Sequence, residues 1–145
     1  MIKFMATADA PKDVVLPRRS TKCSAGYDFY APCDIYLRHN GCSGLIKLNV
    51  KVILPQDMYL ELHERSSLAG KQDVVLECGG IIDSDYANNP DNDGCICVKL
   101  RNNGDMDVFL AKGSRICQGI IKRYYVTDDD KAEMQRSGGF GSTGE

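Results

Sequence analysis

Apolar and polar residues alternate along several short stretches of this chain, and this period of two constrains the fold more than any other feature. Residues 45–52 (LIKLNVKV), 58–64 (MYLELHE) and 95–101 (CICVKLR) all follow the pattern. Alternation over such lengths is typical of half-buried strands, because successive side chains point to opposite faces. We therefore predict three strands here, with Lys51 and Cys97 on the faces opposite their apolar neighbours.

Turn residues separate these stretches, and helical periodicity is almost missing. Pro, Gly, Asn and Asp gather between the predicted strands, as in residues 102–105, NNGD. The best helical candidate is one or two turns over residues 68–71, with Ser66 or Ser67 as the N-cap. Many short strands at even spacing predict an all-β sandwich or barrel.

The chain is expected to form one domain followed by a flexible arm. A length of 145 residues suits a single domain with a real core. Residues 127–145 begin with an acidic, apolar-poor stretch and end in RSGGFGSTGE, a Gly/Ser-rich composition typical of flexible termini. Phe140 is the exception, because a large ring between glycines has nothing of its own to pack against. We assign residues 1–126 to the β-domain and 127–145 to the arm.

Composition and charge exclude several classes of function. The net charge of −2 gives no global basic field, so we expect no nucleic-acid binding. No apolar run approaches the length of a membrane span, and the first residues lack the apolar stretch of a signal peptide. These features predict a cytoplasmic or nuclear protein without a membrane partner.

The cysteines are expected to be reduced, small core residues rather than metal ligands. Their odd number and the missing secretion signal favour free thiols. Cys95 and Cys97 have one residue between them, not the two of a typical zinc knuckle, and only His39 and His63 are available as imidazole ligands. The seven are Cys23, Cys33, Cys42, Cys78, Cys95, Cys97 and Cys117.

Five segments carry polar residues that strand packing does not need. Residues 64–71, ERSSLAGK, set a cation and two hydroxyls at a possible helix start, which is either a phosphate site or a capped turn. In residues 79–87, GGIIDSDYA, Asp83 and Asp85 share one face if the strand continues. That pair is either an acid–base pair or an Asp-rich turn. The other three are AGYDFYA, SRICQG and the glycine-rich end.

Taken in order, AGYD, RSSLA, GGIIDSDY, RICQ and GGFGSTG resemble the five motifs of the trimeric dUTPase family. The resemblance covers essentially the whole chain. It implies a jelly-roll-like, distorted β-barrel that assembles as a homotrimer, with active sites at the subunit interfaces. It further implies hydrolysis of dUTP to dUMP and pyrophosphate with Mg²⁺, which limits uracil incorporation into DNA and supplies dUMP for dTTP synthesis.

The resemblance also implies a role for each matching residue around the uracil and the sugar. Asp83 would be the general base that activates the water attacking the α-phosphorus. Tyr86 would stack under the deoxyribose and leave no room for a 2′-hydroxyl. The hairpin formed by Gly80, Ile81 and Ile82 would pair its backbone with the uracil edge, excluding thymine and cytosine.

The remaining matches would serve the triphosphate. Asp28 would hold Mg²⁺ through water, in keeping with the reluctance of this ion to lose its waters. Phe140 would close over the uracil of a neighbouring subunit's site as the arm orders. Phosphate contacts would come from Arg65, Ser66, Ser67, Gln118, Arg136, Gly141, Ser142 and Thr143.

Three departures from the family pattern are visible. Glu64 replaces the usual Pro before Arg-Ser-Ser, which brings a carboxylate near the phosphate site. Residues 87–94, ANNPDNDG, lengthen the connection after the tyrosine motif. Arg136 stands one residue nearer Phe140 than the family's arginine does, so Gln135 takes that place in a gap-free alignment.

Two other functions remain open from the sequence. A dCTP deaminase shares the fold and a similar Arg-Ser-Ser-Leu-Ala segment, but it relies on a glutamate where this chain has Lys99. A non-catalytic or weakly active dUTPase-like protein that binds a regulatory partner is the second alternative. The departures favour it, whereas Asp83, Tyr86 and Phe140 argue against it.

Overall fold

The computed structural model describes residues 1–134 and 136–139. Twelve strands, one α-helix and one 3₁₀-helix occur in these residues, so the all-β prediction is confirmed. Every strand pairing there is antiparallel. The strands are β1 Lys3–Ala6, β2 Arg18–Arg19, β3 Tyr27–Tyr30, β4 Ile35–Leu37, β5 Cys42–Lys47, β6 Val50–Ile53, β7 Met58–Glu64, β8 Val74–Cys78, β9 Ile81–Asp83, β10 Cys97–Asn102, β11 Val108–Leu110 and β12 Arg115–Arg123.

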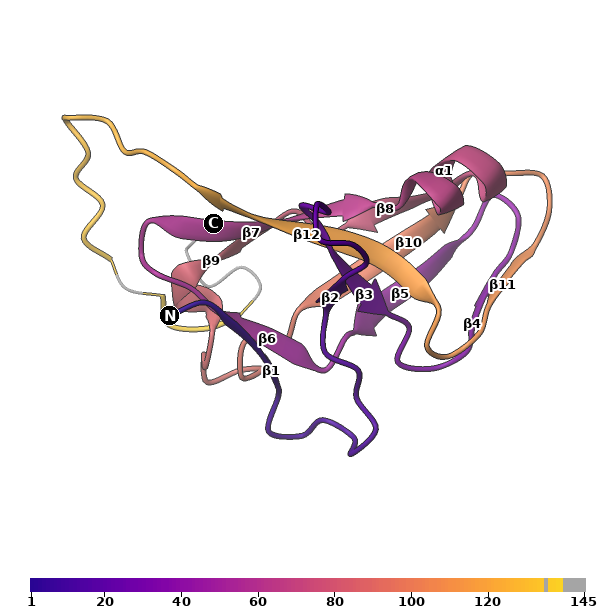
Figure 1. Ribbon diagram of the computed structural model, residues 1–145, viewed down its shortest axis with the longest axis horizontal. Helices are drawn as coiled ribbons and strands as arrows, with labels where there is room; N and C mark the ends of the chain where they lie inside the picture. The colour runs from indigo at the N-terminus through magenta and orange to yellow at the C-terminus, as the bar shows by residue number, and fades with distance from the viewer. Residues whose placement is uncertain (135, 140–145) are drawn as a thin grey trace.

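The largest sheet is built around β12, the nine-residue strand drawn in orange in Figure 1. Its order is β2-β3-β12-β7-β9. Strand β12 pairs with β3 on one side and with β7 along its length on the other. Gly119 lies at the crowded centre, because a Cβ there would come within 3.0 Å of the Leu60 and Phe29 side chains, at 2.8 and 2.9 Å.

Three smaller sheets complete the β-domain. Their orders are β5-β10-β8, β1-β6 and β11-β4. Apolar side chains from all four sheets form one core, and α1 contributes Leu68. The largest fully buried apolar side chains are Phe29, Leu37, Leu60, Ile96, Leu100 and Ile116.

The predicted strands are confirmed in part. Strand β7 has the predicted bounds of residues 58–64. Residues 45–52 are wrong as one strand, because Asn49 adopts a left-handed φ of 59° and separates β5 from β6. Residues 95–101 begin as a strand only at Cys97. Lys51 was predicted on a polar face, but it is buried and its ammonium group pairs with the Asp93 carboxylate.

The short helix is present, but its predicted cap is wrong. Helix α1 spans Ser66–Gln72 and ends at Asp73, which takes a left-handed φ of 53°. The N-cap is Arg65, one residue earlier than Ser66, and no side chain caps the helix. Leu68 is its one buried residue, so packing of a single apolar side chain holds the helix to the sheet.

After β12 the chain leaves the β-domain and turns back toward β9, as the yellow trace in Figure 1 shows. Residues 124–134 are exposed and form neither helix nor strand. Among the described residues, no helix has both the length and the apolar character that crossing a bilayer requires. The assignment of residues 127–145 as a separate arm stays a prediction.

Candidate substrate site

Nine of the predicted site residues line two pockets that share no residue. One pocket, of about 160 Å³, lies beside β9 and is lined by Gly79, Ile81, Ile82, Asp83, Tyr86, Cys97, Arg136 and Gly139. The other, of about 190 Å³, lies between β3, β12 and α1 and is lined by Ser20, Ser24, Gly26, Asp28, Arg65, Ser66 and Gln118. We call them the Asp83 pocket and the Asp28 pocket.

A glycine turn shapes the backbone wall of the Asp83 pocket. Gly80 has a φ of +70°, a conformation that favours glycine, and its carbonyl accepts a hydrogen bond of 2.9 Å from the Leu62 amide. The turn connects β8 and β9, which pair within different sheets, so the predicted hairpin is wrong. Ile82 is buried, whereas Ile81 stays 61% exposed and offers an apolar surface at the pocket.

The strand does not continue from Asp83 to Asp85 as the shared-face prediction required. Strand β9 ends at Asp83, and a 3₁₀ turn, η1 Ser84–Tyr86, follows. Both carboxylates nevertheless meet one guanidinium. Arg136 Nη2 donates to Asp83 Oδ2 at 2.6 Å, and its Nε donates to Asp85 Oδ1 at 2.9 Å.

Arg136 is therefore placed in the Asp83 pocket despite its shifted position in the last motif. Its guanidinium carbon also lies 5.5 Å from the Tyr86 ring centroid, a cation–π distance. The side chain is 14% exposed. In the single chain, the first residues of the glycine-rich segment thus lie on that chain's own Asp83 and Tyr86.

Tyr86 is held between the sheet and the loop that follows it. The residue is buried, and burial raises the pKa of its phenol. Its Oη lies 3.3 Å from the carbonyl of Cys95, to which it donates, and accepts a hydrogen bond of 2.7 Å from Asn92 Nδ2. The ring thus presents one face to the pocket while its hydroxyl is fixed inside the protein.

Cys97 is a pocket residue that the sequence prediction missed. It was expected in the core as a space-filling thiol, but it lines the Asp83 pocket. The alternation of β10 could have indicated this position, because Cys97 is the apolar side chain on the strand face opposite Val98 and Leu100. The core prediction for the cysteines is right for Cys95, Cys97 and Cys117, which are buried, and wrong for the exposed Cys23, Cys33 and Cys42, while Cys78 is half-buried.

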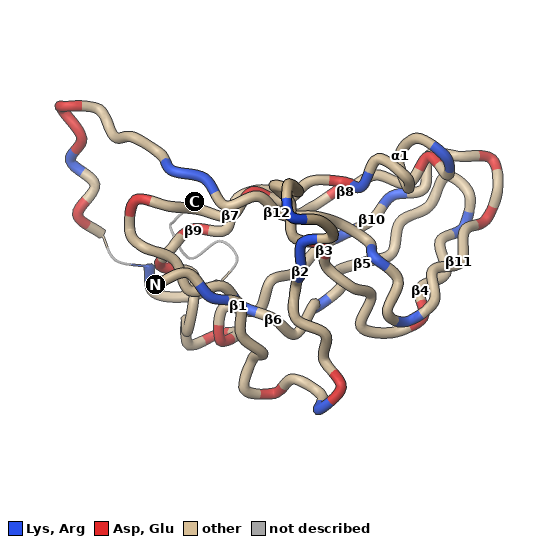
Figure 2. Tube along the Cα trace, in the orientation of Figure 1, with Lys and Arg blue, Asp and Glu red and all other residues tan. Residues whose placement is uncertain are grey.

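Asp28 organises the second pocket through its carboxylate. Arg65 Nε lies 3.0 Å from Asp28 Oδ1, while Arg115 Nη1 and Ser20 Oγ donate to Oδ2 at 3.3 and 2.5 Å. Asp28 and Arg65 are largely buried, so solvent screens their contact little, whereas the Arg115 side chain is 46% exposed. Arg115 and Ser20 did not figure among the predicted site residues. Figure 2 shows the basic residues where β2, β3 and β12 meet.

The remaining predicted phosphate residues surround this carboxylate. Gln118 lies opposite Asp28 in the sheet and donates from Nε2 to the Glu64 carbonyl at 3.1 Å. Ser66 lines the pocket, and Ser67 Oγ lies 3.4 Å from Arg65 Nη1. The exposed side chain of Glu64 is not among the lining residues, so the pocket wall gains no second carboxylate beside Asp28.

Within a single chain the two pockets lie toward opposite ends of strand β7. Strand β7 connects them: Tyr59 pairs with Asp83 at one end, and the strand ends at Glu64, just before Arg65. Five residues of extended chain span about 17 Å. A paired strand in the middle of a sheet is rigid, so Asp83 and Arg65 stay far apart.

The predicted arm residues lie partly outside the described chain. Phe140, Gly141, Ser142 and Thr143, together with Gln135, are not among the residues that the structure describes. Their predicted roles remain predictions. Of the arm's predicted contacts, the structure describes only those of Arg136.

The donor set of the Asp28 pocket fits a magnesium ion held through water. Residues 1–134 and 136–139 contain no group of three His, Cys, Asp or Glu side chains arranged to ligate a metal directly. A carboxylate offers about four lone-pair sites, and Arg65, Arg115 and Ser20 use three of those on Asp28. One site is left for a metal-bound water.

Comparisons with known proteins agree with one another. The family model described as dUTPase matches residues 12–144. A deoxyuridine 5′-triphosphate nucleotidohydrolase from Lactococcus lactis is 39% identical over 132 residues, covering 89% of this chain and 87% of that protein.

Comparison with solved structures identifies the fold. A crystal structure of dUTPase from Streptococcus mutans has a TM-score of 0.78 and 32% identity, covering 86% of this chain and 98% of that one. A mutant dUTPase from phage phi11 of S. aureus, whose structure includes a structural Mg(II) ion, has a TM-score of 0.74 at 19% identity. It covers 92% of this chain and 97% of its own, and that likeness concerns the fold alone. The predicted jelly-roll-like β-barrel is confirmed.

Proposed function

The chain belongs to the dUTPase family, and on that premise we propose that it hydrolyses dUTP to dUMP and pyrophosphate with Asp83 as the general base. Asp83 takes a proton from a water molecule as the water oxygen bonds to the α-phosphorus. The bond between that phosphorus and the α,β-bridging oxygen breaks, and pyrophosphate leaves. The exposed carboxylate at the end of β9 beside Tyr86 supports this role.

In the proposed reaction, the Arg136 guanidinium changes its partners when the substrate binds. Its guanidinium now contacts the oxygen Oδ2 of Asp83, at 2.6 Å, and Asp85. A triphosphate offers it more negative charge than two half-exposed carboxylates do. On binding, Arg136 exchanges the carboxylates for phosphate oxygens, which frees Asp83 Oδ2 for the water and neutralises charge on the departing pyrophosphate.

The observation that carries the proposal is the separation of the two pockets. In this scheme the Asp83 pocket would receive the base and sugar, with Arg136 beside them, and the Asp28 pocket would present Arg65, Ser66 and Gln118 to the phosphates. A site that needs both must take the Asp28 pocket from a second copy of the chain. We propose a homotrimer, in which a head-to-tail contact closes into a ring and repeats this junction three times.

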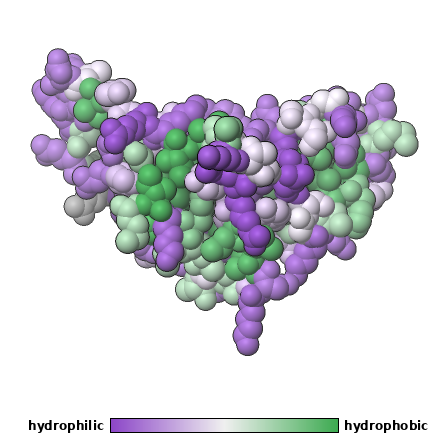
Figure 3. All heavy atoms as spheres, viewed as in Figure 1, coloured by the Kyte–Doolittle hydropathy of each residue, from purple (hydrophilic) through white to green (hydrophobic). Residues whose placement is uncertain are grey.

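Exposed apolar residues on the β-domain are compatible with such contacts. Tyr36 and Phe109, a cross-strand pair of β4 and β11, are 59% and 62% exposed. Figure 3 shows apolar atoms gathered in separate patches over the face in view. Apolar patches on a protein surface mark regions that other chains cover.

The proposal includes magnesium bound in the Asp28 pocket. Asp28 would hold the ion through a water, and the triphosphate oxygens would supply direct ligands. The ion would supply positive charge against the phosphates. Arg65 and Gln118 would orient the same phosphates from the pocket wall.

The test replaces the general base by its uncharged isostere. Asp83→Asn keeps the size of the side chain and an oxygen for Arg136, but cannot accept the proton of water. Pyrophosphate release from dUTP with Mg²⁺ is expected to fall by a factor of about 10³ or more, while calorimetry still detects nucleotide binding. An Asp83→Asn protein with full turnover would refute the general-base assignment. Rapid ammonia release from dCTP by the unchanged protein would identify a deaminase instead.

A further inference from the structure

The loop of residues 87–94 is ordered by its own side chains rather than by a regular element. Three of its residues, Asn88, Asp93 and Gly94, take left-handed φ values of 60°, 57° and 76°. Asn89 Oδ1 accepts hydrogen bonds of 3.1 Å from two backbone amides, those of residues 91 and 92. A loop held in this way has one shape, so its side chains point in fixed directions.

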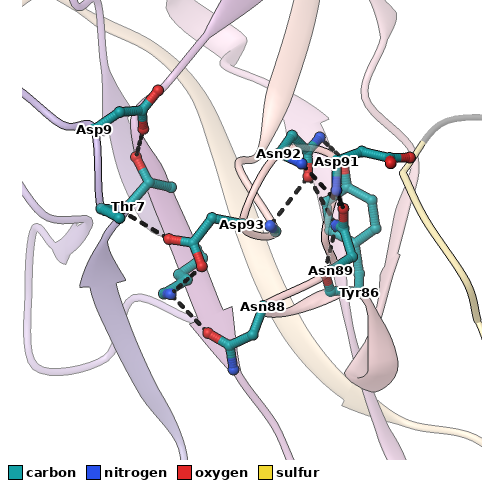
Figure 4. A network of polar contacts seen from close by, with 11 residues as sticks. Thr7, Asp9, Tyr86, Asn88, Asn89, Asp91, Asn92 and Asp93 are labelled. Atoms are coloured by element: carbon teal, nitrogen blue, oxygen red, sulfur yellow. Dashed lines mark hydrogen bonds and ion pairs between the residues drawn. The ribbon is translucent and has the colours of Figure 1, made fainter.

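Two hydrogen bonds fix the orientation of the Asn92 amide group. Its Oδ1 accepts from the backbone amide of Gly94 at 3.0 Å and from Asn89 Nδ2 at 2.7 Å. With the oxygen turned into the loop, Nδ2 points the other way, toward Tyr86. Figure 4 shows Asn92 and Asn89 against the Tyr86 ring.

The hydroxyl of Tyr86 is the partner of that amide. Asn92 Nδ2 donates to Tyr86 Oη at 2.7 Å. Asn89 Nδ2 also donates to the backbone carbonyl of Tyr86, at 2.8 Å. Hydrogen bonds from the loop therefore hold Tyr86 at two points, its backbone carbonyl and its ring hydroxyl.

An ion pair ties the far side of the loop to the β-domain. Lys51 Nζ lies 2.7 Å from Asp93 Oδ1 and 2.6 Å from Asn88 Oδ1, while Asp93 Oδ2 accepts from the Ala8 amide at 2.9 Å. These contacts appear on the left of Figure 4. The loop that holds Tyr86 is thus attached to β6 and to the N-terminal segment.

We propose that Asn92 is a positioning residue that sets discrimination against ribonucleotides by holding the Tyr86 ring. The inference rests on the proposed function, in which Tyr86 packs under the deoxyribose and excludes a 2′-hydroxyl. A ring excludes one oxygen atom only if it cannot tilt away. The Tyr86 side chain is fixed at its tip by Asn92, and the longer loop of this chain supplies that contact.

The consequence concerns the preference for dUTP over UTP. Without the Asn92 amide, the Tyr86 hydroxyl loses the shorter of its two described hydrogen bonds, of 2.7 Å, and keeps that of 3.3 Å to the Cys95 carbonyl. The ring then gains freedom to move toward the space that Asn92 occupied, and UTP is accommodated better. The loss of one such hydrogen bond is expected to lower the ratio of kcat/KM for dUTP to that for UTP about tenfold.

The experiment compares Asn92→Ala with Asn88→Gly, measuring kcat/KM for dUTP and for UTP. Asn88→Gly removes one of the two acceptors of Lys51 but leaves the Lys51–Asp93 ion pair and both hydrogen bonds to Tyr86 in place, and glycine suits its left-handed φ of 60°. We expect the ratio to fall in Asn92→Ala and to stay unchanged in Asn88→Gly. An unchanged ratio in folded Asn92→Ala would overturn the inference.

A double-mutant cycle separates positioning from general damage to the loop. Tyr86→Phe removes the same hydrogen bond from the other side, together with the bond of 3.3 Å to the Cys95 carbonyl, so alone it should lower the ratio by at least the same factor. Adding Asn92→Ala to Tyr86→Phe should then change the ratio little. An equal further loss in that background would contradict positioning through the hydroxyl. If Asn92→Ala does not fold, an unchanged ratio in Tyr86→Phe overturns the inference by itself.

The outcomes also distinguish this inference from the proposed function. If the unchanged protein releases no pyrophosphate from dUTP, the proposed function is wrong, and the inference is wrong with it. If the unchanged protein hydrolyses dUTP and Asn92→Ala keeps its full preference for dUTP, only the inference is wrong.

Discussion

Replacing Lys51 by Met tests whether the buried ion pair of the 87–94 loop stabilises the protein. The Lys51 side chain is 10% exposed and that of Asp93 30% exposed. Removing one partner of a fully buried pair costs about 3–5 kcal/mol, because the other charge is left uncompensated. Asp93 is less buried than that and keeps its bond to the Ala8 amide. We therefore expect Lys51→Met to lower the free energy of unfolding by about 2–3 kcal/mol.

Urea denaturation at fixed subunit concentration measures this loss, with Lys47→Met as the matched control. Lys47 is an exposed lysine of the neighbouring strand β5, and its replacement should change stability by no more than about 0.5 kcal/mol. An equal effect of the two substitutions would refute the anchoring role of Lys51.

The pH dependence gives a second check on the same pair. The hydrogen bond from Lys51, followed by that from the Ala8 amide, lowers the pKa of Asp93 below its ordinary value of 3.8. A carboxyl with a lowered folded pKa adds stability above its unfolded pKa and loses it as the pH falls through the folded value. The difference between the unchanged protein and Lys51→Met should therefore be full at pH 7 and shrink below about pH 4. A difference that grows on acidification would contradict the assignment.

Two further predictions concern the pockets. Truncation after residue 134 should leave the β-domain folded and the oligomer intact by light scattering, but with turnover reduced at least about tenfold, because Arg136 is lost; full activity would mean that the arm is dispensable. Gly26→Ala would place a Cβ 2.6 Å from Gln118 Oε1, so we expect a several-fold rise in KM for dUTP. By contrast, Gly70→Ala in α1 meets nothing within 4 Å and should stabilise the protein by about 0.5–1 kcal/mol without changing KM. Equal KM values in the two glycine variants would contradict the role of Gln118.

The sequence predicted those parts of the fold that depend on local patterns. Strand β7 follows from its alternation, and the short helix after Arg65 was predicted from the two serines at its start, although neither of them caps it. The break at Asn49 could not be read in the same way, because the alternation runs through it unchanged. A single left-handed residue there turns the chain into another sheet.

Lys51 shows why burial was harder to predict than strand position. Its place in the alternation assigned it to a polar face, yet its partners Asn88 and Asp93 lie 37 and 42 residues away. Only the fold brings them together. The same holds for Asn92, whose contact with Tyr86 depends on the path of an irregular loop.

The resemblance implied the candidate site residue by residue and placed it at subunit interfaces, but the sequence did not show which residues share a pocket. The motifs gave Asp83 and Tyr86 as well as Asp28 and Arg65, and the structure groups them in two pockets. The register of β7 against β9 creates that separation, and pairing registers of distant strands are not encoded in any short segment.

The most direct test of the shared site mixes two inactive chains. Asp83→Asn and Arg65→Ala are co-expressed with different tags, and oligomers that carry both tags are purified. If each site takes the Asp83 pocket from one chain and the Asp28 pocket from the next, random assembly of equal amounts leaves about a quarter of the sites intact. Pyrophosphate release from dUTP should then recover to about a quarter of the unchanged protein's rate before selection for mixed oligomers, and to more afterwards. Mixed oligomers no more active than either parent would contradict a site built from two chains.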